Sequence, residues 1–294
     1  MSNATTTTNG KIKMHHGESR LPKWLGIFRS ARGLLCMFIL IVMIAFAVCS
    51  LFGLSPYDPA AQNITESLQG PSGSHWFGTD QFGRDIFVRT SAGLVNSLRI
   101  SLISVAVSGF IGIALGAMGG FFGGWLDRIV GVMTNVLFAF PSLLLALALA
   151  ATLQRNWLTV AVAISIAYTP IFIRVARGPA MSLRSADYVQ ASAAIGRRSL
   201  WTMACHVIPN MSGILVVQIT LSLSWAILTE ASLSFLGFGT PPPAPSLGSM
   251  VYDAQTLSSV APWMLFFPGV ILILTVIGIN LLGELLQQRH EHNA

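Results

Sequence analysis

The sequence has 294 residues, of which 53% are hydrophobic and only 10% are charged, and its mean hydropathy is +0.67. A soluble globular domain carries about 25% charged residues, so this composition excludes a soluble enzyme and a disordered protein. The net charge of +6 does not indicate nucleic-acid binding, because the basic residues are not clustered with aromatic side chains. We therefore expect a chain whose solvent is largely lipid.

Six apolar segments approach the length of about 20 helical residues that crosses a bilayer core. They are Leu34–Leu54, Ile100–Met118, Ile129–Leu153, Leu158–Ile173, Met211–Thr229 and Trp263–Leu282. The first is longer than the apolar core of a cleaved signal peptide. The fourth is short and contains Pro170, so we expect it to continue toward Arg177 by snorkelling or by burial against neighbours. The sequence thus predicts an all-α, polytopic membrane protein with six transmembrane helices.

The basic residues predict how these spans are oriented. With the N-terminus inside, thirteen of the 17 Lys and Arg residues lie in the cytoplasm, and Arg84, Arg89, Arg99 and Arg155 lie outside. Because cytoplasmic loops carry an excess of basic residues, we expect both termini in the cytoplasm. A tail of residues 1–33, low in complexity at its start, then precedes a transmembrane domain of residues 34–294.

The predicted outer loop of residues 55–98 contains a segment with helical features. Thr79 or Asp80 can cap a helix in which apolar and charged residues alternate, and such a helix could lie at the membrane interface. The preceding Gly78–Asp85 stretch is expected to act as a turn and helix cap, with direct contact to the transported solute as the alternative.

The predicted cytoplasmic loop of residues 174–210 is the most informative part of the chain. Ser185 is expected to cap a short helix that Gly196 ends, Ser199 to start a second helix, and Pro209 to mark the entry to the fifth span. The small residues Ala191–Ala194 permit close approach of another protein surface. An amphipathic hairpin that lies on the membrane is the alternative interpretation.

The sequence lacks the motifs of nucleotide hydrolysis, zinc proteolysis and cysteine-based metal or redox sites. It contains neither a G-x-x-x-x-G-K-[ST] phosphate loop nor an H-E-x-x-H pair, and Cys36, Cys49 and Cys205 form no C-x-x-C spacing. We therefore expect no cofactor, no metal and no catalytic residue. Glu230 and Glu284 lie near span ends, where a snorkelling or capped carboxylate is favoured over a proton relay. Pro141, within the third span, can kink the helix or shape a pathway.

Several motifs together resemble one family. The run Tyr188-Val189-Gln190-Ala191-Ser192, then Gly196 and Ile208-Pro209-Asn210, resembles the cytoplasmic EAA loop of binding-protein-dependent ABC importer permeases. The run from Gly78 to Asp85 resembles the G-T-D-x-x-G-R-D signature of the dipeptide, oligopeptide and nickel subfamily. Matches of the same kind occur at Phe140–Ser142, Ala231–Gly237, Pro242–Ser246 and Asn280–Gly283. The resemblance covers nearly the whole chain and is closest to the C-type permease of the pair.

The resemblance implies a type I ABC importer permease fold and a set of site residues. The residues implied to couple the chain to an ATPase are Tyr188, Val189, Gln190, Ala191, Ser192, Ala193, Gly196, Ile208 and Pro209. The residues of the outer signature are Gly78, Thr79, Asp80, Gly83, Arg84 and Asp85. Gln190 stands where the family usually has Glu, Leu247 where it has Trp, and Glu284 where it has Asp.

The function implied by the resemblance is transport without chemical change of the solute. The chain would be a permease subunit in the inner membrane of a bacterium, importing di- or oligopeptides by alternating access. Its partners would be a homologous B-type permease, two ATP-binding subunits, an extracytoplasmic solute-binding protein and membrane lipid, with no nucleic acid. Nickel or another chelated metal, glutathione or an opine are alternative solutes. A secondary transporter is less favoured, because neither midplane coupling-ion residues nor an inverted repeat are visible.

Overall fold

The computed structural model describes residues 30–291, which form helices and connecting loops without a β-strand. The helices are α2 (Ala31–Leu51), α3 (Ile86–Phe122), α4 (Gly124–Phe138), α5 (Ser142–Thr152), α6 (Trp157–Arg184), α7 (Asp187–Ala194), α8 (Ser199–Thr202), α9 (Ile208–Asn210), α10 (Ser212–Phe235), α11 (Leu247–Ala254) and α12 (Trp263–Glu291). Two further single turns are the 3-10 helix η1 (Ile64–Glu66) and the π-helix η2 (Met203–Val207). Most of the predicted N-terminal tail lies outside the described residues.

Five helices are long and apolar enough to cross a membrane, namely α2, α3, α6, α10 and α12. The bent pair of α4 and α5 makes a sixth if it counts as one span. Five of the six predicted spans therefore contain one continuous helix each, and the all-α fold class is confirmed. Only the third predicted span, Ile129–Leu153, is interrupted.

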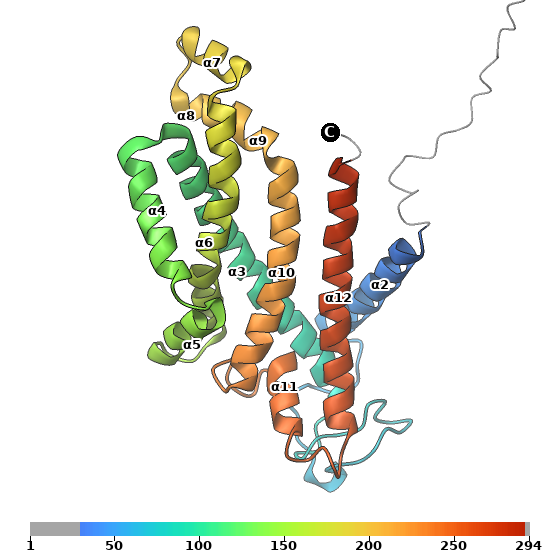
Figure 1. Ribbon diagram of the computed structural model, residues 1–294. Coiled ribbons are helices and arrows are strands. Elements are labelled where there is room, and N and C mark those ends of the chain that lie inside the picture. The colour runs from blue at the N-terminus through green and yellow to red at the C-terminus, as the bar shows by residue number, and fades with distance from the viewer. Residues whose placement is uncertain (1–29, 292–294) are drawn as a thin grey trace, which may run out of the picture.

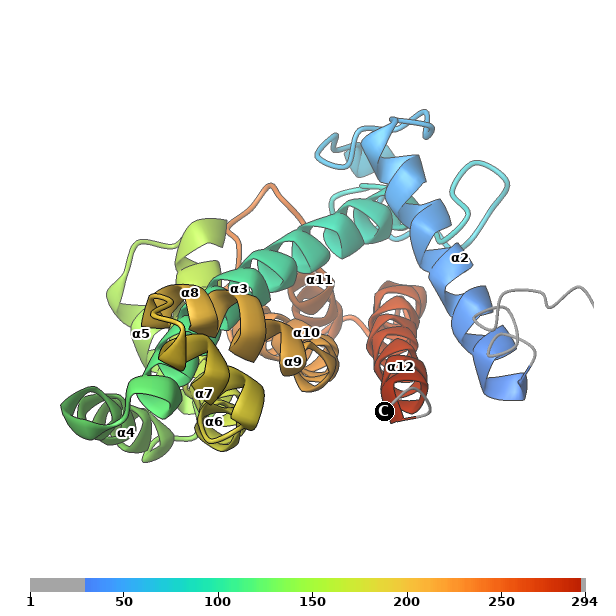
Figure 2. The same ribbon diagram turned by 90° about the horizontal axis from the view of Figure 1, so that it is seen from above.

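Figure 1 shows that the chain crosses between two ends of the molecule. The loop that carries α7 and α8, the turn between α3 and α4, and the end of α12 lie at one end, which we call the α7 end. The loop after α2, α5 and α11 lie at the opposite end. Figure 2 shows α12 between α10 and α2, and one buried hydrophobic cluster joins α2, α3, α10 and α12. The segments that the sequence predicts on one side of the membrane are thus together at one end.

The first turn of α3 differs from the prediction. The expected separate helix of the outer loop, capped by Thr79 or Asp80, is wrong, because the helix starts at Ile86 and runs for 37 residues into the second span. Asp85 is the N-cap, and its Oδ1 accepts a hydrogen bond of 2.9 Å from the backbone N–H of Val88. A capping carboxylate satisfies a backbone donor that the helix itself leaves free.

The third predicted span breaks at Pro141. Helices α4 and α5 meet there at an angle of 86° across a break of a few residues. Proline has no N–H to donate, and it disfavours helical geometry in the residue before it. The sequence allowed a kink at this position, but the structure has two short helices in place of one straight span.

Helix α6 is longer than the predicted fourth span. It continues past Ile173 to Arg184 and includes Pro170 and Pro179. The expected continuation toward Arg177 is confirmed, and α6 extends into the predicted loop of residues 174–210 as far as Arg184. The two arginines that suggested a loop are accommodated by neighbouring helices: Arg177 pairs with Asp127 of α4, and Arg174 lies 4.1 Å from the centre of the Phe138 ring. Paired in this way, they do not end a helix.

Glycines on α3 allow this helix to pack closely against α6. Gly112, Gly116 and Gly120 of α3, the glycine row, are spaced four residues apart and face the backbone of α6. A Cβ atom at Gly116 would lie 2.4 Å from the carbonyl oxygen of Ile173, and one at Gly112 would lie 2.5 Å from Cβ of Phe172. Only glycine allows the two helix backbones to approach this closely.

Candidate functional site

Residues 185–211, the α7 segment, form the first candidate site. Gly196 has a φ of +77°, in the left-handed region that a β-branched residue resists. It follows α7 directly after Ile195, and the backbone N–H of Arg197 donates to the carbonyl of Ser192. The prediction that Gly196 ends this helix is confirmed. Open space surrounds the position where its Cβ would be, so glycine is needed there for its conformation alone.

The start of α7 differs from the prediction. Ser185 does not cap α7, because it is the C-cap of α6 and its hydroxyl donates to the carbonyl of Ser182. The backbone N–H groups of Val189 and Gln190 are bonded to the carbonyl of Ala186 instead. The second helix starts at Ser199 as predicted, and Pro209 lies in the short α9 just before α10.

Two contacts attach α7 to the rest of the bundle. The side chain of Val189 is buried with Met203, Val207 and Met211 in a hydrophobic cluster that reaches α3 and α6. The hydroxyls of Ser192 and Thr202 lie 3.0 Å apart and are buried. These contacts fix one face of α7, so its other face is held in a defined position.

The remaining face of the α7 segment is exposed and partly apolar. Ile195 is 74% exposed, and Tyr188, Leu200 and Trp201 are also exposed. Gln190 and Ala191 are exposed as well, with the Gln190 amide donating to the carbonyl of Ser185. The side chain of Ala193 lies outside the described part of the structure. Of the predicted coupling residues, Val189 and Ser192 thus face the bundle, whereas Tyr188, Gln190 and Ala191 face outward.

A cavity of about 260 Å³ lies between the α7 segment and the ends of α3 and α6. Its lining includes Arg184, Arg197, Gln190 and Phe122. The guanidinium group of Arg197 lies over the Trp201 ring at 4.0 Å, and that of Arg184 donates to the carbonyl of Phe122. The surface beside the outward face of α7 is therefore basic.

Residues 78–85 form the second candidate site, a closed turn at the opposite end of the molecule. Asp80 is its centre: Oδ1 accepts from the backbone N–H groups of Phe82 and Arg84, and Oδ2 accepts from Nε of Arg84 at 2.6 Å. The Nε atom of Arg89 lies 3.5 Å from the same Oδ2. Thr79, Asp80, Arg84 and Asp85 are all buried. These internal contacts favour the structural role that the sequence suggested.

The two glycines of the 78–85 turn are required by geometry. Gly83 has a φ of +69°, and a Cβ atom there would lie 1.7 Å from the carbonyl oxygen of Asn63. Gly78 has a φ of +77°, and its Cβ would lie 2.5 Å from the carbonyl oxygen of Gln69. Both are positions where a side chain has no room.

Two residues that the sequence did not single out complete this turn. The indole N–H of Trp263 donates to the carbonyl of Thr79 across 184 positions of sequence, and Nδ1 of His75 lies 2.7 Å from Oδ2 of Asp85. Neither residue lies at a spacing that predicts the contact. The side chain of His75 is buried.

Glu230, near the end of α10, is fully buried and does not snorkel. Its Oε1 accepts a hydrogen bond of 2.7 Å from the Ser234 hydroxyl, and its Oε2 has no hydrogen-bond partner among the described residues. Of the two predicted alternatives, a snorkelling or a capped carboxylate, snorkelling is wrong at this position, whereas Glu284 is exposed. In the described part of the chain, no group of three or more His, Cys, Asp or Glu side chains is arranged to hold a metal ion.

Comparison with known proteins shows the class of protein to which this fold belongs. A solved structure of the MetNI methionine ABC transporter in inward-facing conformations has the same fold, with a TM-score of 0.51 and 19% identity over 67% of this chain and 95% of that chain. The family described as binding-protein-dependent transport system inner membrane component matches residues 112–293. The chain belongs to this family and is a multi-pass inner-membrane permease subunit of an ABC importer.

Relatives with higher sequence identity cover most of the chain. The dipeptide transport system permease protein DppC of Alkalihalophilus pseudofirmus is 37% identical over 83% of this chain and 81% of its own length. The glutathione transport system permease protein GsiD of Pectobacterium atrosepticum is 37% identical with the same coverage. The oligopeptide transport system permease protein OppC of Bacillus subtilis is 36% identical over 86% of this chain and 81% of its own.

Proposed function

We propose that this permease subunit imports small peptides and that ATP is hydrolysed by separate subunits. Relatives named for dipeptide and oligopeptide transport support the solute class. The sequence itself has no phosphate-binding loop, which supports a division of labour between this chain and an ATPase. No bond of the solute changes, so the chain is proposed to act as a transport subunit and not as an enzyme.

The observation that carries the mechanism is the outward face of the α7 segment. Tyr188, Ile195 and Trp201 are exposed beyond the ends of the long helices, while Val189 fixes the segment to the bundle. We propose that this face docks into an ATPase subunit. When nucleotide closes the ATPases, the displaced α7 segment changes the balance between inward-facing and outward-facing states of the permease.

The proposed complex contains four kinds of subunit: this chain, a homologous B-type permease, two ATPases and a solute-binding protein. Large apolar side chains exposed along α2, such as Phe38, Ile41 and Ile44, provide surface for lipid and for the second permease. The basic cavity beside α7 supports an ATPase surface that offers acidic or acceptor groups to Arg184 and Arg197.

The α7 end is proposed to face the cytoplasm, as the positive-inside rule predicts. Cys205 is exposed at this end, and Ile64 is 79% exposed at the other. In a chain without Cys36 and Cys49, a membrane-impermeant maleimide should label Cys205 only after the cells are opened. In a chain without native cysteines, Ile64→Cys should be labelled from outside. The reverse pattern would overturn the orientation.

Docking is tested with Gly196→Val in the assembled importer. Since the space around Gly196 is open, this change strains only the backbone after α7. Gly53→Val is the matched control, because Gly53 also has a positive φ of +60° and open space but lies at the other end. We expect at least a tenfold loss of peptide uptake for Gly196→Val alone, with both variants inserted at normal abundance. Normal uptake with co-purifying ATPases would contradict docking.

Gln190→Glu should preserve or strengthen docking, in contrast to Gly196→Val, which should disrupt it. It restores the charge that the family usually has on the outward face of α7, next to the two arginines that line the adjacent cavity. We expect uptake to be preserved or raised. A severe loss would show that the ATPase surface facing position 190 is not complementary to a carboxylate.

Glutathione is the second candidate solute, because the GsiD relative is as similar to this chain as the DppC relative. Uptake of labelled dialanine, a tetrapeptide and glutathione, each by the complete importer in proteoliposomes, separates these solutes. Glutathione uptake in the absence of dialanine uptake would replace the dipeptide proposal.

A further inference from the structure

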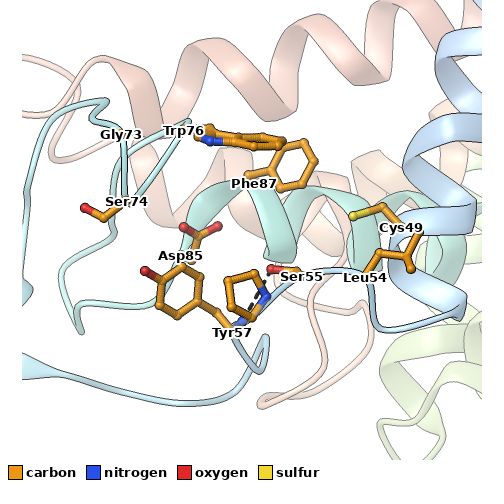
Figure 3. A pocket seen from close by; sticks show the side chains of 10 residues that line it. Cys49, Leu54, Ser55, Tyr57, Gly73, Ser74, Trp76, Asp85 and Phe87 are labelled. Carbon is orange, nitrogen blue, oxygen red and sulfur yellow. Dashed lines mark hydrogen bonds between the residues drawn. The ribbon is translucent and has the colours of Figure 1, made fainter.

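A cavity of about 330 Å³ lies at the end opposite α7, in a place that the transport mechanism does not use. It is formed by the last turn of α2, the loop that follows it and the first turn of α3 (Figure 3). Its lining includes Cys49, Ser55, Tyr57, Trp76, Asp85 and Phe87. We call it the α2 cavity.

The walls of the α2 cavity are aromatic. The Trp76 and Phe87 rings meet edge to face with 5.0 Å between their centres, and the Tyr57 ring lies 4.8 Å from the His75 ring. Trp76 is nevertheless 65% exposed, so it offers ring surface that no described residue covers. Aromatic ring faces carry negative potential and attract cations.

The floor of the α2 cavity carries negative charge. Asp85 is the one charged residue in its lining, and it is held in place by the Val88 N–H on Oδ1 and by His75 on Oδ2. Nε2 of His75 lies 3.5 Å from Glu66, so the group of Glu66, His75 and Asp85 is net negative whether or not the imidazole is protonated. Arg84, the nearest basic residue in sequence, is engaged with Asp80.

We propose that the α2 cavity binds an alkylammonium group, with the cation over the Trp76 ring and near the Asp85 carboxylate. An anion would be repelled by this carboxylate, whereas a cation would be attracted both by the carboxylate and by the aromatic ring faces. The cation can come from the ethanolamine headgroup of a phospholipid or from the amino end of a free peptide. The proposal does not depend on which solute the importer carries.

Cys49 makes the proposal measurable, because its thiol lies in the cavity wall and points toward Phe87 (Figure 3). In the assembled importer, a chain with Cys49 as its single cysteine is treated with cationic and anionic methanethiosulfonate reagents of equal size. The rate of each reagent with free 2-mercaptoethanol in solution corrects for its intrinsic reactivity. We expect the corrected rate at Cys49 to be at least about tenfold higher for the cationic reagent.

Two variants test whether the preference of Cys49 for the cationic reagent arises from the charge of the α2 cavity. Asp85→Asn should abolish it while keeping α3 capped, because asparagine caps helices as well as aspartate does. Asp58→Asn is the matched control: Asp58 is an exposed carboxylate of the same loop and does not line the cavity. A preference that persists in Asp85→Asn, or that is lost equally in Asp58→Asn, would overturn the assignment.

Ligand protection then identifies the source of the cation. Tetramethylammonium should slow modification of Cys49 several-fold, whereas neutral tert-butanol should not, and Trp76→Leu should weaken this protection more than Trp76→Tyr. Protection in nanodiscs that contain phosphatidylethanolamine, relative to phosphatidylglycerol alone, assigns the lipid headgroup. Protection by dialanine in phosphatidylglycerol nanodiscs assigns the peptide amine. If none of the three cations protects Cys49, the proposal is wrong.

Discussion

Arg177 of α6 donates two parallel hydrogen bonds to Asp127 of α4, from Nε to Oδ1 at 2.5 Å and from Nη2 to Oδ2 at 2.7 Å. The two residues are 50 positions apart, and both side chains are only partly buried. Such a two-pronged contact fixes orientation as well as distance. The contact connects α4, the first half of the broken third span, to the part of α6 that lies near the α7 end.

A double-mutant cycle should measure this contact. We expect Asp127→Ala and Arg177→Ala each to destabilise the protein, with a coupling free energy of about 1 kcal/mol, at the upper end for a partly exposed pair. Chemical denaturation of the purified chain in detergent gives the free energies of unfolding. Arg128→Ala serves as the control, because Arg128 is exposed and makes no ion pair among the described residues. Strict additivity of the two single changes would show that the bond contributes nothing.

Substitutions in α3 should distinguish the glycine row from its neighbour Gly109. Gly116→Ala should destabilise the protein by about 1–3 kcal/mol, because its methyl group would press on the α6 backbone. Gly109→Ala should be nearly neutral or stabilising, since its Cβ would lie at an ordinary contact distance of 3.7 Å from the Phe172 ring. The comparison of melting temperatures is decisive only if both variants insert normally. Equal effects would mean that α3 and α6 are not in the close contact described above.

Glu230 should tolerate replacement by a neutral side chain of the same size but not loss of its hydrogen bond. Glu230→Gln keeps the size of the side chain and an oxygen for Ser234, and it replaces a buried ionisable group by a neutral one. We expect its melting temperature to equal or exceed that of the wild type. Glu230→Ala should lower stability by about 2–4 kcal/mol, because it leaves a cavity and an unpaired hydroxyl. A Gln variant as unstable as the Ala variant would indicate that the carboxylate is needed in its ionised form.

Asp253 should make stability depend on pH. It lies in α11, outside the long apolar helices, and burial raises the pKa of its carboxyl above the usual range, although Arg89 and Arg84 act in the opposite direction. The pKa of Asp253 is therefore higher in the folded state than in the unfolded state, where it is about 4. The protein is most stable, with respect to this group, below about pH 4, where the carboxyl is protonated in both states. That stability is lost as the pH rises through the folded-state pKa. Asp253→Asn should therefore gain stability relative to the wild type as the pH is raised above about 4. A difference that stays constant with pH would contradict this.

The sequence predicted the elements that depend on local pattern and missed those that depend on distant partners. The apolar runs located the spans, and Gly196 and Ser199 marked turns correctly, because length and backbone conformation are local properties. The continuation of α6 toward Arg177 was expected, but its ion-pair partner Asp127, 50 residues away in the sequence, was not. The burial of Glu230 and the contact of His75 with Asp85 likewise depend on how segments meet in space.

Only Ser185 and Ala186 separate α6 from α7, and this short joint makes α6 a lever arm. At about 1.5 Å per residue, its 28 residues span roughly 42 Å. A tilt of about 5° imposed at the α7 end would move the opposite end of the rod by about 4 Å, on the scale of one side chain. Because the glycine row holds α3 and α6 in close contact, a push delivered at the α7 end would move the two helices together.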